Sequence, residues 1–306
     1  MEHVLVIIGN PVEQMLSEIH IENVRRNLSD IGTDTTSPKW LAKKIAVEIP
    51  VFWTEKTSEA ERMHLALNNL PVDYAVISTK GRRKRLLIAD MDSTIIDCEC
   101  IDELADFAGV KAKVAAITER AMRGDLDFKA ALAERVAMLA GLSEDILEKT
   151  FRERVRLTPG ARTLVQTMRN HDAYAALVSG GFTYFTNRVR DACGFNYDQA
   201  NVLLQKNGTL TGEVQNPILD GDAKLAALIR LSVENVIPLE QTLAVGDGAN
   251  DLPMIQASGL GVAYKAKPKV AASAKVRINH ADLTALLYLQ GYHRDEFATN
   301  VGKSPF

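Results

Sequence analysis

The sequence predicts an α/β protein in which a doubly wound, Rossmann-like parallel sheet carries a helical insertion and follows a small α+β segment. Two observations predict the sheet: apolar runs that end in short polar segments, and helical stretches that lie between those runs. A third observation predicts the insertion, because residues 101–158 show helical periodicity and no strand-like run. The length of 306 residues is enough for about two domains with buried cores.

The first 80 residues mix strand and helix patterns without a chemical motif. Apolar runs predict strands over residues 4–8, 44–52 and 72–78, and amphipathic stretches predict helices over residues 16–28 and 58–68. This pattern is typical of a small α+β domain, and we assign no catalysis to it.

Farther along the chain, three apolar runs predict strands that are buried on both faces of a parallel sheet: residues 86–89, 173–178 and 242–245. The stretches between them predict helices over residues 161–170, 184–192 and 223–231. In the insertion, apolar residues recur three and four positions apart, as in Phe128, Leu132, Val136 and Leu139. We therefore predict an N-terminal domain over residues 1–80, a catalytic core over 85–97 and 160–306, and a helical cap over 98–159.

Composition excludes several classes of protein. The formal net charge of −3 argues against general nucleic-acid binding, and we interpret the basic run at residues 82–85 as a solvated junction. Cys98, Cys100 and Cys193 lack the spacing of a zinc site or a disulfide framework. No apolar run reaches the ~20 residues of a membrane helix, and the first residues lack the features of a signal peptide. We expect a cytoplasmic protein with reduced thiols and with neither a nucleic-acid nor a membrane partner.

A polar segment follows each buried strand directly. The three segments are Asp90-Met91-Asp92-Ser93-Thr94, Ser179-Gly180-Gly181 and Gly246-Asp247-Gly248-Ala249-Asn250-Asp251. The carboxyl ends of parallel strands meet at the ligand-binding edge of an open sheet. We therefore expect the three segments, of which the second is predicted as a turn, to converge in space.

The acidic residues of these segments predict a metal site. Asp90 and Asp92 occupy alternate positions at a strand end, where neighbouring carboxylates repel unless a cation lies between them. With Asp247 from another strand end, hard oxygen ligands without histidine or cysteine favour Mg²⁺. A single aspartate after a strand is commonly a turn or capping residue, but the complete set is hard to explain in that way.

Other residues of the segments suit a phosphate. The Ser179 hydroxyl is a donor, and Gly180 lets the backbone N–H approach an anion closely. Lys224 opens a predicted helix and is a candidate for neutralising the phosphate, while Asn250 is a candidate for holding either the phosphate or that lysine. Taken singly, a Ser-Gly-Gly segment is most often a loop and a lone lysine is usually solvated.

Together, these segments resemble the four motifs of the haloacid-dehalogenase-type phosphatases, over about residues 85–300. Within that family the chain is similar to the members that act on O-phosphoserine, at Glu99, Met122, Gly124, Phe128 and Arg135. The spacing of seven also places Phe128 and Arg135 on nearly the same face of a helix. Taken alone, Phe128 would more often pack inside a cap and Arg135 would pair at the surface.

The resemblance implies Mg²⁺-dependent hydrolysis of O-phosphoserine to serine and phosphate, the last step of serine biosynthesis. Asp90 would form an aspartyl phosphate, and Asp92 would act as general acid and base. The metal ligands would be Asp90, Asp247 and the backbone carbonyl of Asp92, with Asp251 as a support. The substrate contacts would come from Glu99, Met122, Phe128, Arg135, Ser179, Gly180, Lys224 and Asn250. Arg135 would bind the substrate carboxylate and Glu99 its ammonium group.

Several alternatives stay open. Phosphothreonine, phosphohomoserine or another small monoester would use the same chemistry, and one methyl group discriminates by only about 1–3 kcal/mol. A non-catalytic phospho-acceptor switch also phosphorylates an aspartate at a strand end, but it has no use for Asp92 or for a large cap. Residues 1–80 are a candidate for an ACT-like, amino-acid-sensing module. A homodimer, feedback control and a preference for Mg²⁺ or Mn²⁺ are left open.

Overall fold

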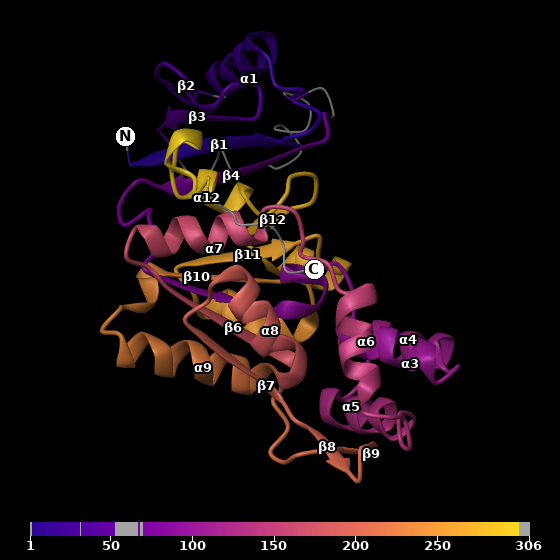
Figure 1. Cartoon of the computed structure of the whole chain (residues 1–306). Helices are drawn as coiled ribbons and strands as arrows, with labels where there is room; N and C mark the ends of the chain where they lie inside the picture. Colours follow the sequence, from indigo (N-terminus) through magenta and orange to yellow (C-terminus); the bar gives the residue numbers. More distant parts are fainter. Residues whose placement is uncertain (1, 31, 53–66, 68–69, 300–306) are drawn as a thin grey trace. The chain divides into compact units, whose positions relative to one another are not determined.

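The computed structural model describes residues 2–30, 32–52, 67 and 70–299. The chain forms two compact units, Met1–Arg83 with Val276–Phe297, and Lys84–Lys275 with Ala298–Phe306 (Figure 1). The domain boundaries predicted from the sequence place residues 276–297 with the catalytic core. Those boundaries stay a prediction.

The first unit contains a four-stranded antiparallel sheet in the order β2-β3-β1-β4. Helix α1 (Glu18–Asp30) packs its buried residues Ile21, Val24 and Leu28 into the core of the unit. These elements confirm the predicted helix over residues 16–28 and all three predicted strands, whereas β2 was missed because it is short. The predicted helix over residues 58–68 lies outside the described residues, apart from Leu67. The strands are β1 (His3–Gly9), β2 (Lys39–Ala42), β3 (Ala46–Val51) and β4 (Val72–Ser78).

The later segment of this unit adds β12 (Val276–Ile278), α12 (Ala285–Leu289) and η5 (Arg294–Glu296). The buried carboxylate of Asp73 on β4 accepts hydrogen bonds from the backbone N–H groups of residues 279–281, at 2.7–3.3 Å. One carboxylate therefore fixes the start of the later segment to β4.

The interpretation of the basic run at residues 82–85 as a solvated junction is wrong for Arg82 and Lys84, whereas Arg83 and Arg85 are exposed. Arg82 is bonded to the Glu48 carboxylate at 2.6 Å and to the backbone carbonyl of Leu289 at 2.8 Å. Lys84 is buried and donates to the backbone carbonyl of Glu240 at 2.9 Å. Arg82 and Lys84 therefore make contacts that hold the folded chain together.

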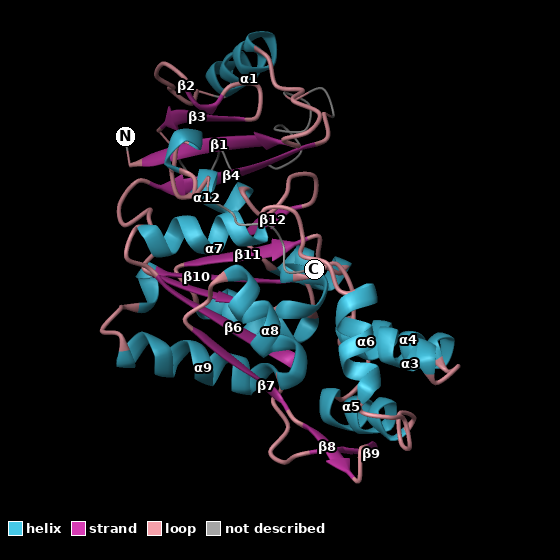
Figure 2. Cartoon of the chain, viewed as in Figure 1, coloured by secondary structure: helices cyan, strands magenta, loops and turns pink. Residues whose placement is uncertain are grey.

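The second unit is built on a parallel sheet (Figure 2). Its strand order is β11-β10-β5-β6-β7. Every residue of β5 and β10 is buried, as the continuous apolar runs predict. Leu86 and Ile88 of β5 share a core cluster with residues of α9 and α10, while α7 and α8 contact β6. This arrangement confirms the doubly wound α/β fold. The strands are β5 (Leu86–Ala89), β6 (Tyr174–Phe182), β7 (Tyr197–Asn201), β10 (Thr242–Gly246) and β11 (Leu260–Tyr264).

The helices of this unit confirm the three that were predicted for the core. They are α7 (Ala161–Asn170), α8 (Thr183–Cys193), α9 (Gly221–Glu234), α10 (Leu252–Ala257) and α11 (Pro268–Ser273), with the short turns η2 (Met91–Ile95), η3 (Leu239–Gln241) and η4 (Ala249–Asp251). The segment Ser179-Gly180-Gly181 was predicted as a turn, but it continues β6. The pairing of β6 with β7 loses its regular register after Val178, which bends this strand end.

The insertion between β5 and α7 is helical, as predicted. It contains α3 (Cys100–Phe107), α4 (Lys111–Met122), α5 (Phe128–Ala137) and α6 (Asp145–Arg154) (Figure 1). Ile117, Ala121 and Met122 of α4 form a small core with Ala131 of α5. An ion pair of 2.9 Å joins Lys129 of α5 to Asp220, which caps the start of α9. The insertion therefore has a core of its own and contacts the helix that carries Lys224.

Candidate active site

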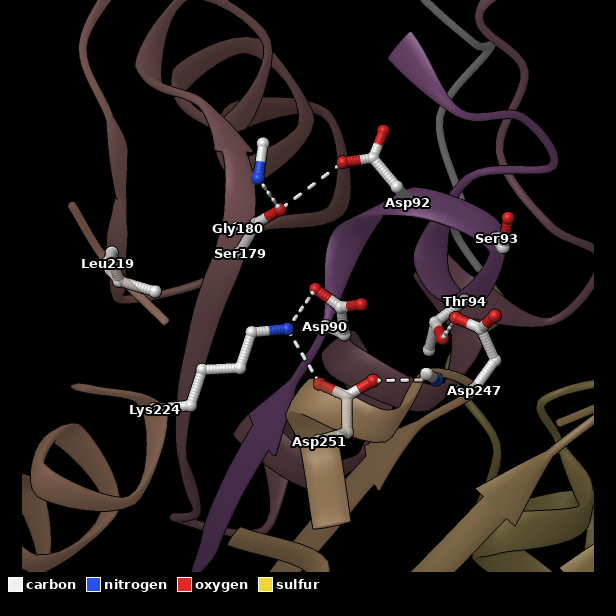
Figure 3. A network of polar contacts seen from close by, with 12 residues as sticks. Asp90, Asp92, Ser93, Thr94, Ser179, Gly180, Leu219, Lys224, Asp247 and Asp251 are labelled. Atoms are coloured by element: carbon white, nitrogen blue, oxygen red, sulfur yellow. Dashed lines mark hydrogen bonds and ion pairs between the residues drawn. The ribbon is translucent and has the colours of Figure 1, made fainter. Parts of the chain in front are cut away.

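The polar residues at the carboxyl ends of β5, β6 and β10 meet at one edge of the sheet (Figure 3). The backbone N–H of Asp90 donates to the carbonyl of Val245 at 3.0 Å, which holds the segment after β5 against β10. Asp92 contacts Ser179 at the end of β6, since the serine hydroxyl lies 3.3 Å from its Oδ2. The convergence expected from the strand pattern is present.

Lys224 is the cation at the centre of this edge. It lies in the first turn of α9 with no exposed surface, and its Nζ is 2.6 Å from Asp90 Oδ1 and 2.6 Å from Asp251 Oδ1. Burial alone would lower the pKa of Lys224, but Asp251 and Asp90 raise it above the ordinary value of a lysine. The side chain is therefore a fixed positive charge between two carboxylates.

Three carboxylates crowd together beside that lysine. Oxygens of Asp90, Asp247 and Asp251 lie within 4.8 Å of one another, and all three residues are buried. Burial, followed by the charge of Asp251, raises the pKa of Asp247 to about 7 and holds that of Asp90 well above its usual value. The Thr94 hydroxyl offsets part of this effect by donating to Asp247 Oδ1 at 3.2 Å. Such a cluster of hard oxygen donors suits a divalent cation.

The predicted ligand set and the carboxylate cluster overlap but are not identical. Both oxygens of Asp251 are engaged, Oδ1 by Lys224 and Oδ2 by the backbone N–H of Gly248 at 3.0 Å. Asp251 is thus placed as a support for the lysine and the loop. The carboxylate of Asp92 lies outside the cluster and points toward Ser179.

Asp92 occupies a buried site with two donors. Its Oδ1 accepts the backbone N–H of Cys100 at 2.9 Å, and its Oδ2 accepts the Ser179 hydroxyl at 3.3 Å. Burial raises the pKa of Asp92 above its usual value, although the Cys100 contacts oppose the shift. A raised pKa favours the protonated form that a general acid requires.

The bent end of β6 is held by a residue that the sequence analysis missed. The side-chain amide of Asn201, at the end of β7, donates to the carbonyls of Gly180 at 2.9 Å and Leu219 at 3.3 Å. Its Oδ1 accepts the N–H of Leu219 at 2.7 Å. Asn201 is buried and joins the Ser179-Gly180 segment to the chain that leads into α9. No local pattern marks it, because its partners are distant in sequence.

Between this edge and the insertion lies a small cavity of about 30 Å³. Ser179 and Gly180 line it from the sheet, and Phe128 approaches so closely that a Cβ on Gly180 would lie 2.6 Å from its ring. The predicted site residues that line the cavity are Asp90, Asp92, Glu99, Met122, Phe128, Arg135, Ser179, Gly180 and Asn250. Lys224 and Asp247 lie behind this lining, beside Asp90.

The insertion contributes one carboxyl group and one guanidinium group to the cavity. Glu99 accepts the Ser93 hydroxyl at 2.6 Å, and burial followed by the charge of Asp92 holds the pKa of Glu99 well above its usual value. Arg135 is 2% exposed, so the alternative of a surface ion-pair partner is wrong. Burial lowers the pKa of Arg135, and the nearby acids Glu99 and Asp102 oppose that shift. Within the described residues the Oδ1 atom of Asn250 has no hydrogen-bond partner, and the residue lines the same cavity.

Comparison with known proteins identifies the class of protein that carries this fold and site. The sequence model of the haloacid dehalogenase-like hydrolases matches residues 87–256. The chain belongs to this family.

Its relatives within the family include phosphoserine phosphatases. One from Polaromonas sp. (strain JS666 / ATCC BAA-500) is 48% identical over 225 residues, which are 72% of this chain and 95% of the relative. One from Saccharomyces cerevisiae is 35% identical over 288 residues, 93% of this chain and 92% of the relative. A solved phospho-aspartyl intermediate analogue of phosphoserine phosphatase is 39% identical, with a TM-score of 0.65 over 67% of this chain and 98% of that chain. The resemblance seen in the sequence is confirmed.

Among the described residues, none of the helices combines the length and the apolar character needed to span a membrane.

Proposed function

We propose that this chain is a Mg²⁺-dependent phosphomonoesterase that hydrolyses O-phosphoserine to serine and phosphate. One observation carries the proposal: one cavity brings Asp90 and Asp92 together with a carboxylate and a guanidinium from the insertion, those of Glu99 and Arg135. A phosphate ester of an amino acid carries the three charged groups that this lining complements. The names of the relatives support the same substrate.

The donor set fits a magnesium ion. Asp90 and Asp247, with the backbone carbonyl of Asp92, would hold the ion, and Asp251 would keep Lys224 and the Gly248 loop in place. When bound, the ion neutralises negative charge on the carboxylates and on the phosphoryl oxygens. Hard oxygen donors favour Mg²⁺ or Mn²⁺ over softer metals.

Asp90 is the proposed nucleophile. Burial and the charge of Asp251 raise the pKa of Asp90, and Lys224 opposes this shift, which favours the carboxylate form that attacks. An oxygen of Asp90 forms a bond to phosphorus while the bond from phosphorus to the seryl oxygen breaks, so the product is an aspartyl phosphate. The Ser179 hydroxyl and the Gly180 N–H, both at the cavity wall, donate to the phosphoryl oxygens.

Asp92 is the proposed general acid and base. In its protonated form it gives a proton to the departing seryl oxygen, and serine leaves as the alcohol. The resulting carboxylate then takes a proton from water, whose oxygen attacks phosphorus and releases phosphate from Asp90. The raised pKa of Asp92 and its position opposite Ser179 support both steps.

The insertion provides recognition and closure. Arg135 binds the substrate carboxylate, Glu99 the ammonium group, and Met122 and Phe128 contact the carbon skeleton. Because the cavity of about 30 Å³ is small beside phosphoserine, we expect the insertion to move outward to admit the substrate and to return to exclude water. The Lys129–Asp220 ion pair is a contact that opening would break.

Phosphate release from a panel of small monoesters tests the proposal. The panel contains phosphoserine, phosphothreonine, phosphohomoserine and O-phosphoethanolamine, with Mg²⁺ or with EDTA. We expect the highest kcat/KM for phosphoserine and loss of activity in EDTA. A higher kcat/KM for another ester would identify that ester as the substrate. Absence of steady phosphate release would favour a non-catalytic phospho-acceptor switch.

Arg135→Ala is expected to reduce kcat/KM for phosphoserine about 100-fold, because a charge-assisted contact to the carboxylate is lost. O-Phosphoethanolamine lacks only that carboxylate, so its kcat/KM should change less than threefold. Arg123→Ala removes an exposed cap arginine and is the control, with no change expected for either ester. Equal losses on both esters with Arg135→Ala would remove this residue from carboxylate recognition.

Mg²⁺ should stabilise the protein more at pH 8 than at pH 5.5. The pKa of Asp247 is raised to about 7 in the folded chain, whereas it is near 4 in the unfolded chain. Protonated Asp247 therefore stabilises the fold fully below the unfolded pKa, and this contribution is lost as the pH rises through 7. Mg²⁺ replaces the proton, and at 100 times its Kd it adds about 2.7 kcal/mol. Thermal unfolding with Mg²⁺ or EDTA at both pH values checks this. A shift that is equal at both pH values, or that persists in Asp247→Asn, would contradict it.

Other expectations stay predictions. They are a place as the last step of serine biosynthesis, an ACT-like N-terminal module, a homodimer and a cytoplasmic location. The predicted domain boundaries belong with them.

A further inference from the structure

Three helices of the insertion meet at one hydrogen-bonded chain. Arg135 of α5 donates through Nη1 to the Thr118 hydroxyl of α4 at 2.9 Å, and that hydroxyl lies 2.6 Å from Asp102 Oδ1 of α3. Arg135 and Thr118 are 2% and 3% exposed. The bond between Arg135 and Thr118 is therefore buried, and the bond between Thr118 and Asp102 is part-buried.

The direction of each bond follows from the chemistry of the groups. A guanidinium only donates, so the Thr118 oxygen must accept from Arg135. The single hydroxyl proton then has two acceptors within reach, Asp102 at 2.6 Å and the carbonyl of Val114 at 3.1 Å. The shorter, charge-assisted contact to Asp102 takes the proton. Asp102 thereby fixes the hydroxyl so that a lone pair faces Arg135.

These contacts fix one side of the guanidinium. Nε donates to the carbonyl of Ala131 at 3.0 Å, and one N–H of Nη1 donates to Thr118. The side chain of Arg135 forms no other hydrogen bond with the described residues. N–H groups of Nη1 and Nη2 therefore remain for a bidentate contact with a carboxylate. Arg135 lines the cavity, whereas Thr118 and Asp102 do not.

We propose that Thr118 and Asp102 are positioning residues that set the preference for a carboxylate-bearing substrate by holding Arg135 in its binding orientation. The inference rests on the proposed function, in which Arg135 binds the carboxylate. Both residues act through Arg135, so they affect only the esters that Arg135 recognises. An arginine without this acceptor has many rotamers, and it must be ordered again at each binding event.

Thr118→Val removes the hydroxyl at almost constant volume and provides the test. We expect KM for phosphoserine to rise about tenfold with kcat within twofold of the wild type, while kcat/KM for O-phosphoethanolamine stays within twofold. Thr118→Ser restores the hydroxyl and should return KM to within threefold of the wild-type value. In an Arg135→Ala background, Thr118→Val should change nothing further, because the residue it acts through is absent.

Thr150→Val is the matched control. Thr150 lies in α6 of the same insertion, is fully buried, and its hydroxyl has no hydrogen-bond partner among the described residues. This substitution should change kcat/KM for neither ester. Asp102→Ala is the second variant and replaces Thr118→Val as the test if that protein does not fold. We expect the same selective rise in KM for phosphoserine.

The outcomes separate the inference from the function on which it rests. Suppose that Arg135→Ala lowers kcat/KM selectively for phosphoserine. If Thr118→Val and Asp102→Ala then lower kcat/KM equally for both esters, or for neither ester, the positioning role is wrong. If Arg135→Ala itself impairs both esters equally, the proposed carboxylate contact is wrong, and the positioning role is rejected with it.

Discussion

Asp90→Asn is expected to reduce kcat for phosphoserine by about four orders of magnitude or more, because the amide cannot form the phosphoenzyme bond. The residue stands first after β5 and is held by Lys224 at 2.6 Å, so the substitution changes the reacting group with little change in shape. Steady-state phosphate release measures the effect. Residual activity above one-tenth of the wild-type value would remove Asp90 from the nucleophilic step.

Stability distinguishes this loss from unfolding. Burial and the charge of Asp251 raise the pKa of Asp90, so its ionised form is costly in the folded chain. A neutral amide removes that cost, while Lys224 keeps its contact with Asp251. Without metal, the unfolding midpoint of Asp90→Asn should equal or exceed that of the wild type. A much lower midpoint would assign the lost activity to misfolding.

Lys224→Met is expected to abolish activity and to destabilise the protein by about 3–5 kcal/mol at pH 8 without metal, because two buried carboxylates lose their counter-charge. That corresponds to a fall of about 10 °C in the unfolding midpoint. The deficit should shrink at pH 5.5. The pKa of Asp90 is already raised and rises further without the lysine, and a protonated Asp90 needs no cation.

Thermal unfolding of Lys224→Met at the two pH values measures this effect. Lys206→Met, at an exposed position of the β8 (Leu203–Lys206) strand, is the control and should leave the midpoint unchanged. A deficit in Lys224→Met that is equal at pH 8 and pH 5.5 would show that packing, rather than charge, accounts for the loss.

The sequence predicts those parts of the fold that bury apolar residues on a regular period. The runs that became β5 and β10 are buried throughout, and such strands leave a continuous apolar pattern. β7 was missed because its sequence, Tyr197–Asn201, is largely polar and half-buried. The hairpin of β8 with β9 (Thr209–Val214) was also missed, although Asn207 and Gly208, both at positive φ, form a recognisable turn signal.

The candidate site divides in a similar way. Residues that follow strands, such as Asp90 and Asp247, could be predicted because the sheet brings strand ends together. Asn201, Thr118 and Asp102 could not, since each acts through bonds to residues that are distant in the chain. The small volume of the cavity also depends on how the insertion packs, and no local pattern records that.

Trapping the phosphoenzyme tests the central proposal most directly. Protein mixed with ³²P-labelled phosphoserine and Mg²⁺ is quenched in acid during turnover, and the labelled peptide is identified after proteolysis. We expect an acid-stable, alkali-labile label on the peptide that contains Asp90, and none on Asp90→Asn. Label on another residue, or full turnover of Asp90→Asn without any label, would contradict the account.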